Sequence, residues 1–148
     1  MSACIAADYA DQCRGLITIS AQSMLEDLTV RGIQEAKQGF AQPGQLDRLA
    51  KYHGDKAQWV LDAWTETWCD PMFADWDLAE YLERVYCPNL VLHGELDEYG
   101  SSIQAERFAE LTQGPSALYI LSGLHHMPHK ENPELAVNLI AEFLEPLE

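Results

Sequence analysis

Three histidines lie within five positions near the C-terminus, at His125, His126 and His129 in the stretch SGLHHMPHKENPE. A histidine becomes a useful general base when a carboxylate fixes its tautomer and stabilises its charged form. Such a carboxylate is available at Asp97, in the stretch GELDEYG. Acid–base chemistry would therefore require elements that bring Asp97 beside one of the three histidines.

Two apolar runs precede these polar stretches. Residues 89–94 (NLVLHG) and 116–123 (SALYILSG) each predict a buried parallel strand, and 14–20 (RGLITIS) predicts a third. Helical patterns separate and follow the runs, so we expect an α/β fold with right-handed parallel crossovers. Because the carboxyl ends of parallel strands meet at one edge of a sheet, Asp97 and the histidines are expected at the same edge.

A block of helical patterns between residues 24 and 80 interrupts this alternation. It predicts a helical insertion at 24–80 and a core made of 1–23 and 81–148. Within the helix expected at 56–69, four side chains are predicted to form one stripe along the helix; they are Val60, Ala63, Trp64 and Thr67. The tryptophans of this region either line an apolar acyl or aromatic substrate pocket or form the interior of the insertion; they are Trp59, Trp64, Trp68 and Trp76.

Composition excludes several classes of partner. The formal net charge is −15, with 24 acidic against 9 basic residues and no basic run, which argues against nucleic acid and anionic lipid. No stretch is long and apolar enough for a membrane span, and the first residues do not resemble a signal peptide, so a cytoplasmic location is expected.

Neither a metal nor a cofactor is expected. Pro128 breaks the helical face that His125, His126 and His129 would need for a metal site, and no acidic or thiol ligand has matching spacing. The cysteines form no C-x-x-C pair and are predicted to be reduced, mostly packing thiols, with Cys4 and Cys69 the two considered for reactivity; the four are Cys4, Cys13, Cys69 and Cys87.

The stretches LVLHGELDEYGS and LSGLHHMPHKENPELAVNLIAEFL together resemble the last third of an α/β-hydrolase. In that family an acid follows a G-x-x-D turn and a histidine follows a G-x-G-H-x-P turn. The resemblance implies that Asp97 is the triad acid and His126 the triad base, with His125 standing where the family commonly has glycine. It also implies that His129 is structural, that the insertion is a lid, and that 14–20 is the sixth strand.

The nucleophile of the family lies in a G-x-S-x-G elbow before a helix that commonly reads G-x-I-A-x-x-Y-A. Residues 3–10 (ACIAADYA) match that helix and place the nucleophile one position before Met1. Ser2 is a weak alternative, because aligning it as nucleophile puts Cys4 where the second glycine of the elbow belongs. The sequence therefore resembles the C-terminal portion of an α/β-hydrolase, with acid, base and lid but no evident nucleophile elbow.

Two functions of different classes follow. The resemblance implies a hydrolase that acts on a small ester or related carbonyl substrate by acyl-enzyme chemistry, with His126 as general base and Asp97 as its orienter. The alternative is a catalytically incomplete fragment, an interaction protein or a split-enzyme subunit. In that case the exposed edge of the strand at 14–20 is expected to be covered by a second copy of the chain or by a complementary N-terminal half.

Overall fold

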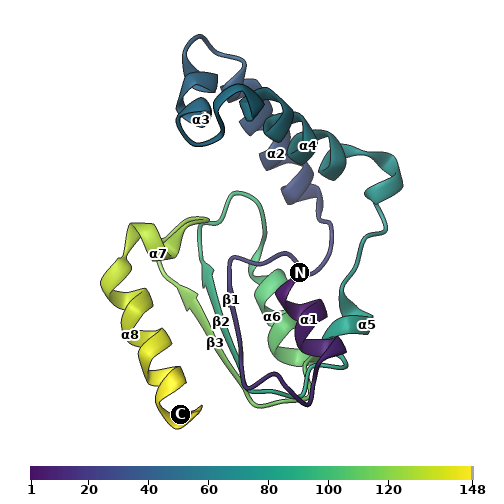
Figure 1. The fold of residues 1–148 in the computed structure, drawn as a ribbon, viewed down its shortest axis with the longest axis vertical. Helices are drawn as coiled ribbons and strands as arrows, with labels where there is room; N and C mark the ends of the chain where they lie inside the picture. The colour runs from purple at the N-terminus through teal and green to yellow at the C-terminus, as the bar shows by residue number, and fades with distance from the viewer. Residues whose placement is uncertain (148) are drawn as a thin grey trace. The chain divides into compact units, whose positions relative to one another are not determined.

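Three parallel strands form the sheet that carries the candidate site, in the order β1 (Leu16–Ile19), β2 (Asn89–Gly94), β3 (Ser116–Leu121) (Figure 1). Asn89 pairs with Leu16 on one side and with Ser116 on the other, so the strands start in register. This confirms the predicted α/β class and the parallel three-stranded sheet. The computed structural model describes residues 1–147.

The predictions that β2 and β3 are buried strands have different outcomes. All six residues of β2 are buried, as its continuous apolar run predicts. The prediction that β3 is equally buried is wrong: Tyr119 and Ile120 are 40% and 39% exposed. The physical reason is strand order, because β3 has only one neighbouring strand whereas β2 has two.

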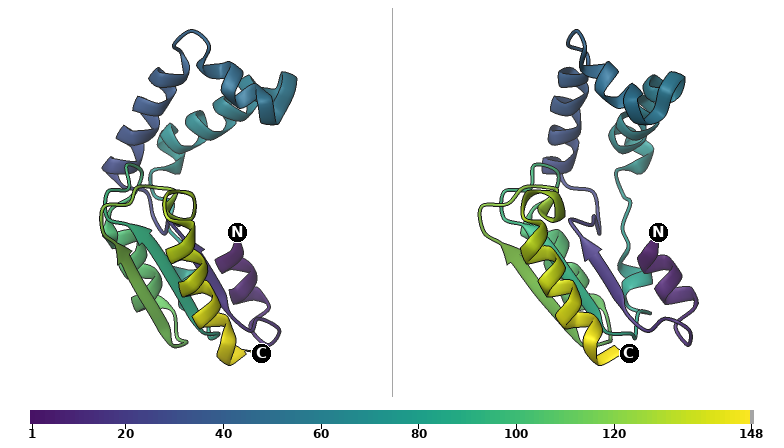
Figure 2. Two further views of the ribbon diagram at one scale, coloured as in Figure 1. Left: turned by 90° about the vertical axis from the view of Figure 1, so that its left-hand side faces the viewer. Right: turned by 60° about the vertical axis from the view of Figure 1, so that its left-hand side comes forward.

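Helices cover both faces of the sheet (Figure 2). α8 (Pro133–Leu144) lies on one face, and α6 (Ser102–Leu111) lies on the other. Asn132 caps the start of α8, because its side chain accepts a hydrogen bond from the Leu135 N–H, and Pro133 is the first residue of the helix. Its partly buried side chains pack on a cluster of Leu90, Leu92 and Leu121; they are Leu139, Ile140 and Phe143.

This part of the molecule also contains a 3-10 turn at Glu145–Leu147 and three shorter α-helices: α1 (Ser2–Asp8), α5 (Ala79–Leu82) and α7 (Pro128–Glu131). α5 is only one turn long, although Leu82, at its end, and Val85, three residues later, are fully buried. α7 was not expected, because its residues follow Met127 as a turn-rich P-H-K-E-N-P stretch. A proline at its first position favours the short helix.

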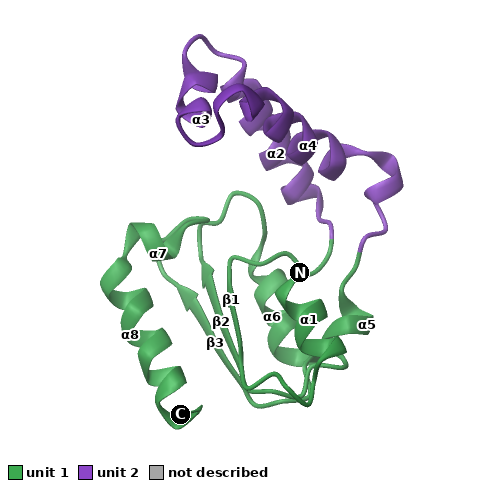
Figure 3. Ribbon diagram, in the orientation of Figure 1, with its two compact units in different colours: residues 1–24, 77–148 green, residues 25–76 purple. Residues whose placement is uncertain are grey.

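The chain forms two compact units (Figure 3). One contains Met1–Met24 and the chain from Asp77 onward, and the other is Leu25–Trp76. Met24 and Asp77 form an isolated antiparallel bridge where the chain leaves and re-enters the first unit. The side-chain oxygen of Gln104 accepts hydrogen bonds from the N–H groups of Ser23 and Met24, at 2.7 and 3.2 Å, which anchors the departing segment on α6.

The second unit consists of α2 (Asp27–Phe40), α3 (Gln45–His53) and α4 (Ala57–Cys69), with 3-10 turns at Gly54–Lys56 and Pro71–Phe73. The predicted stripe of α4 is not its buried face, which is formed by Ala57, Leu61 and Thr65. α4 has apolar residues on several sides, so its sequence alone does not single out one face.

Aromatic residues of the second unit lie in a local cluster. The ring of Trp68 is 5.2 Å from the rings of both Phe73 and Trp76, and Phe73 stacks on Trp76 at 5.4 Å. These separations are typical of favourable aromatic pairs. Trp59 lies apart from this cluster and is 68% exposed. Across residues 1–147, no helix has the length and apolarity that crossing a membrane requires.

Candidate active site

The loops that leave β2 and β3 are joined into one structure. The Leu96 N–H donates to the carbonyl oxygen of Leu124 at 2.8 Å. The carboxylate of Glu95 accepts from the Ser122 hydroxyl at 2.7 Å and from the Gly123 N–H at 2.9 Å, which lowers the pKa of Glu95. Because the two strands are parallel neighbours, these bonds hold the loop with the acid against the loop with the histidines.

Gly94 makes this close approach possible. A Cβ atom at position 94 would lie 2.0 Å from the carbonyl oxygen of His125 and 2.5 Å from that of Leu124, so no other residue fits without moving the histidine loop. The left-handed position of the loop is Gly123, with φ of 72°. His125 does not adopt a positive φ, since Ser20 is the one non-glycine residue among 1–147 that does. The turn therefore accommodates histidine at position 125.

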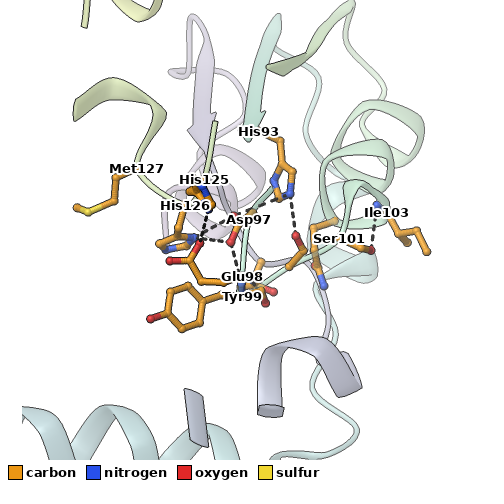
Figure 4. A network of polar contacts seen from close by, with 12 residues as sticks. His93, Asp97, Glu98, Tyr99, Ser101, Ile103, His125, His126 and Met127 are labelled. Carbon is orange, nitrogen blue, oxygen red and sulfur yellow. Dashed lines mark hydrogen bonds and ion pairs between the residues drawn. The ribbon is translucent and has the colours of Figure 1, made fainter. Parts of the chain in front are cut away.

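Asp97 and His126 are in direct contact (Figure 4). Nδ1 of His126 lies 2.9 and 3.0 Å from the two carboxylate oxygens of Asp97. The Asp97 side chain is 0% exposed and that of His126 is 35% exposed. The carboxylate also accepts a hydrogen bond of 2.8 Å from the Tyr99 N–H. A carboxylate against Nδ1 places the ring proton on that nitrogen and leaves Nε2 as the basic atom.

The two groups shift each other's pKa. Burial alone would raise the pKa of Asp97, but the hydrogen bonds from His126 and Tyr99 and the nearby charges of His126 and His93 outweigh it and lower that pKa. The hydrogen bond to Asp97 raises the pKa of His126 above its ordinary 6.5, against the effect of burial, with further contributions from the charges of Asp97, Glu98 and Glu131. The pair thus favours the charged form of both members.

Two further side chains contact the pair. The Tyr99 ring lies edge-on to the His126 ring, with centroids 4.8 Å apart, and the pKa of Tyr99 is raised by burial and by Glu98 and Asp97. His93 is buried at the end of β2, where Nε2 donates to the Gly100 carbonyl at 2.9 Å and lies 3.9 Å from Asp97. His93 was not predicted as a site residue from the sequence. It could have been found because it is a histidine in a stretch, 89–94, that is predicted to be a buried strand.

Glu131 holds the backbone on both sides of His126. One carboxylate oxygen accepts from the His125 N–H at 2.8 Å, and the other accepts from the Met127 N–H at 3.0 Å. Charge-assisted bonds to two amides separated by one residue fix the direction in which the side chain between them points. Glu131 was also missed at the sequence level, where only the acid of the G-x-x-D turn was considered.

The remaining candidates lie apart from this pair. His125 is exposed with Nδ1 3.7 Å from Glu98, and His129 is exposed on α7. Ser2 is the first residue of α1 and is exposed; within residues 1–147 no hydrogen bond joins it to His126. The same residues contain no group of three or more His, Cys, Asp or Glu side chains that could hold a metal ion.

No family model and no curated protein matches the sequence, but solved structures match the fold. A membrane phospholipase A, described as a bacterial virulence factor, superposes with a TM-score of 0.74 over 99% of this chain at 19% identity. A serine hydrolase involved in carbazole degradation gives 0.69 over 96% at 19% identity. The meta-cleavage product hydrolase of Pseudomonas fluorescens IP01 gives 0.68 over 99% at 17% identity. This chain has the fold of the C-terminal portion of an α/β-hydrolase.

The three superpositions cover almost all of this chain but only part of each solved chain. This chain spans 53%, 58% and 61% of the length of those chains. At identities below 20% the likeness concerns the fold. The chemistry of the site must therefore be argued from this chain's own residues.

Proposed function

We propose that this chain carries the acid and base of an α/β-hydrolase-type hydrolase that acts on a small ester or related carbonyl substrate. The observation that carries the proposal is the contact of His126 Nδ1 with both oxygens of the buried Asp97. Burial of the acid and partial exposure of the base are what general-base chemistry needs, because the base must meet substrate and its orienter must not. The three similar structures, two named as hydrolases and one as a phospholipase, support hydrolysis as the reaction class.

In the proposed mechanism Nε2 of His126 takes the proton from a hydroxyl nucleophile as the nucleophile attacks the carbonyl carbon. Asp97 stabilises the imidazolium that forms, and the same proton then passes from Nε2 to the leaving group. His126 next takes a proton from a water molecule, whose oxygen attacks the acyl carbon; the bond between that carbon and the nucleophile oxygen then breaks, and the proton passes from Nε2 to the nucleophile oxygen. Asp97 remains ionised throughout, consistent with its lowered pKa.

The place proposed for the nucleophile is the start of α1. The N-terminal end of α1 lies at the end of the sheet where the strands finish (Figures 1 and 2). Asp97 and His126 belong to the loops that follow β2 and β3 at that same end. Ser2 is the serine of this chain at that place. The helical insertion, with its aromatic cluster, is proposed as the lid that the resemblance implies.

A second candidate function is an interaction or split-enzyme subunit without hydrolase activity of its own. It is favoured by the exposed position of Ser2, which makes no hydrogen bond with His126 in residues 1–147. Here the outer edge of β1 is proposed to pair with a second copy or with a complementary N-terminal half, since a strand edge presents unpaired backbone groups. Light scattering of the purified chain tests this part: a monodisperse monomer contradicts self-association.

Fluorophosphonate labelling tests the hydrolase proposal. The reagent marks activated serines, so intact mass and peptide mapping should show one adduct, on Ser2, that disappears in Ser2→Ala and in His126→Gln but persists in His129→Gln. Hydrolysis of p-nitrophenyl acetate is measured on the same four proteins. Absence of adduct and turnover, with a reference serine esterase labelled in parallel, would reject hydrolase activity for this chain and leave the interaction function.

A further inference from the structure

Cys13 and Cys87 lie at the end of the sheet opposite to the candidate active site. Cys13 precedes the first residue of β1 by three positions, and Cys87 precedes the first residue of β2 by two. The Leu16 N–H donates to the Pro88 carbonyl at 2.8 Å, so the two entering segments run side by side. Strands of four to six residues separate them from the site by roughly 15–20 Å.

The two sulfur atoms are in contact. Cys87 donates its S–H to Cys13 Sγ at a sulfur–sulfur distance of 3.5 Å, and Cys13 donates to the Gly15 carbonyl at 3.5 Å. A disulfide bond of about 2.05 Å requires the sulfurs to approach by roughly 1.5 Å, which small rotations of the two side chains can supply. The residues are 74 positions apart in sequence.

The surroundings give the two thiols different access. Cys87 is 6% exposed. Its backbone is held by Gly114, which packs against the Cys87 carbonyl and donates its N–H to the Val85 carbonyl. Burial, then the contact with Cys13, raises the pKa of Cys87 to about 11. Cys13 is partly exposed in the turn after α1. A small reagent in solution can therefore reach the Cys13 sulfur, whereas the buried Cys87 sulfur is accessible to the Cys13 sulfur that contacts it.

We propose that Cys13 and Cys87 are a disulfide-forming pair, a modification site that reacts with low-molecular-weight disulfides such as oxidised glutathione. The deprotonated Cys13 sulfur attacks one sulfur of the reagent, whose S–S bond breaks and releases a first thiolate. The deprotonated Cys87 sulfur then attacks Cys13 Sγ and releases the second. The two cysteines lose two electrons and two protons, and the reagent is reduced to two thiols.

The bond would link the starts of β1 and β2 covalently. It would also close a loop that contains β1, the whole helical unit Leu25–Trp76 and α5. This site is independent of the proposed hydrolase chemistry because no residue of the pair contacts Asp97 or His126. Its test needs no catalytic activity.

The full chain is incubated with oxidised glutathione and, separately, with diamide, then digested without reduction and mapped by mass spectrometry. We expect the intact chain to lose two hydrogen atoms, one linked peptide joining Cys13 to Cys87, and full reversal by dithiothreitol. Cys4→Ser and Cys69→Ser should behave as the parent chain. Cys87→Ser should instead stop at a stable glutathione adduct on Cys13.

Three results would overturn the proposal. The first is four free thiols after both oxidants, with a reference dithiol oxidised in parallel. The second is a linkage that uses Cys4 or Cys69 or that joins two chains. The third is a Cys13 adduct in the parent chain that never proceeds to the linked form. Circular dichroism of each variant confirms that a negative result comes from a folded protein.

Discussion

The two ends of the three-stranded sheet hold two pairs of reactive side chains in opposite ways. At the carboxyl end, Asp97 and His126 are held by charge-assisted hydrogen bonds, and both favour their charged forms. At the amino end, a single weak sulfur hydrogen bond joins Cys87 to Cys13, and burial favours the neutral form of Cys87. The same parallel register thus produces an acid–base pair at one end and a redox-reactive pair at the other, because the local polarity differs.

The largest expected effect comes from Asp97→Asn at the carboxyl end. The amide cannot accept the Nδ1 proton as a carboxylate does, so any hydrolytic turnover should fall by roughly 10⁴-fold. The pKa of His126 should also fall, because the hydrogen bond to Asp97 is the main cause of its rise. NMR titration of the His126 ring measures the pKa; an unchanged value would contradict the pairing. The oxidation of Cys13 and Cys87 by oxidised glutathione should not change.

Glycine substitutions compare the two ends directly. A Cβ at Gly94 would meet the His125 carbonyl oxygen at 2.0 Å, and one at Gly114 would meet the Cys87 carbonyl oxygen at 2.2 Å. We expect each alanine variant to reduce the free energy of unfolding by about 3 kcal/mol or more, measured in urea. Gly39→Ala in α2 is the control, since nothing lies within 4 Å and helix propensity favours alanine by up to about 1 kcal/mol.

Once each variant is shown to be folded, we compare the effect of Gly94→Ala and of Gly114→Ala on the two ends of the sheet. Gly94→Ala should perturb the NMR signals of His126 and leave oxidation of the cysteine pair intact. Gly114→Ala should slow that oxidation and leave His126 unperturbed. Equal disturbance of both ends by either variant would show that the ends are not independent.

The charge pair also predicts a pH dependence of stability. The pKa of Asp97 is lowered, so its contribution is present above about pH 4 and is lost as pH falls through its folded pKa. The pKa of His126 is raised, so its contribution is present below pH 6.5 and is lost as pH rises through its folded pKa. The stability difference between the parent chain and His126→Gln should therefore be greatest near pH 5, at about 1–2 kcal/mol.

Urea unfolding at about pH 5 and pH 8 measures this difference. His129 is exposed on α7, and His129→Gln should show no comparable pH dependence. If the stability difference between the parent chain and His126→Gln were instead larger at pH 8 than at pH 5, this would contradict the proposed ion pair of Asp97 and His126.

The smallest expected effect is that of Glu131→Gln. The amide retains one acceptor oxygen, so one of the two bonds to the amides of His125 and Met127 is lost or weakened. Stability should fall by about 1 kcal/mol or less because the site is exposed. The pKa of His126 should fall slightly and its ring signals should broaden, whereas Glu106→Gln, at an exposed position of α6, should change neither.

Sequence reasoning succeeded where structure is local or follows from one strand. The bounds of β2 and the α/β class were predicted because an apolar run and an alternation of elements act over short distances. It failed for the exposure of β3 and the buried face of α4, which depend on the elements that happen to pack beside them.

The sequence by itself determined which chemistry is available: an acid after one strand, histidines after the next, and cysteines without a recognisable motif. The resemblance of the sequence to a known family also singled out Asp97 and His126, and the structure shows these two side chains in contact, whereas His125 and His129 lie apart from Asp97. The contact of Cys13 with Cys87, across 74 residues, was decided by the tertiary structure alone. The physical reason is that sequence spacing fixes neighbours along an element, whereas contact between elements is fixed by strand order and by the glycines that permit close backbone approach.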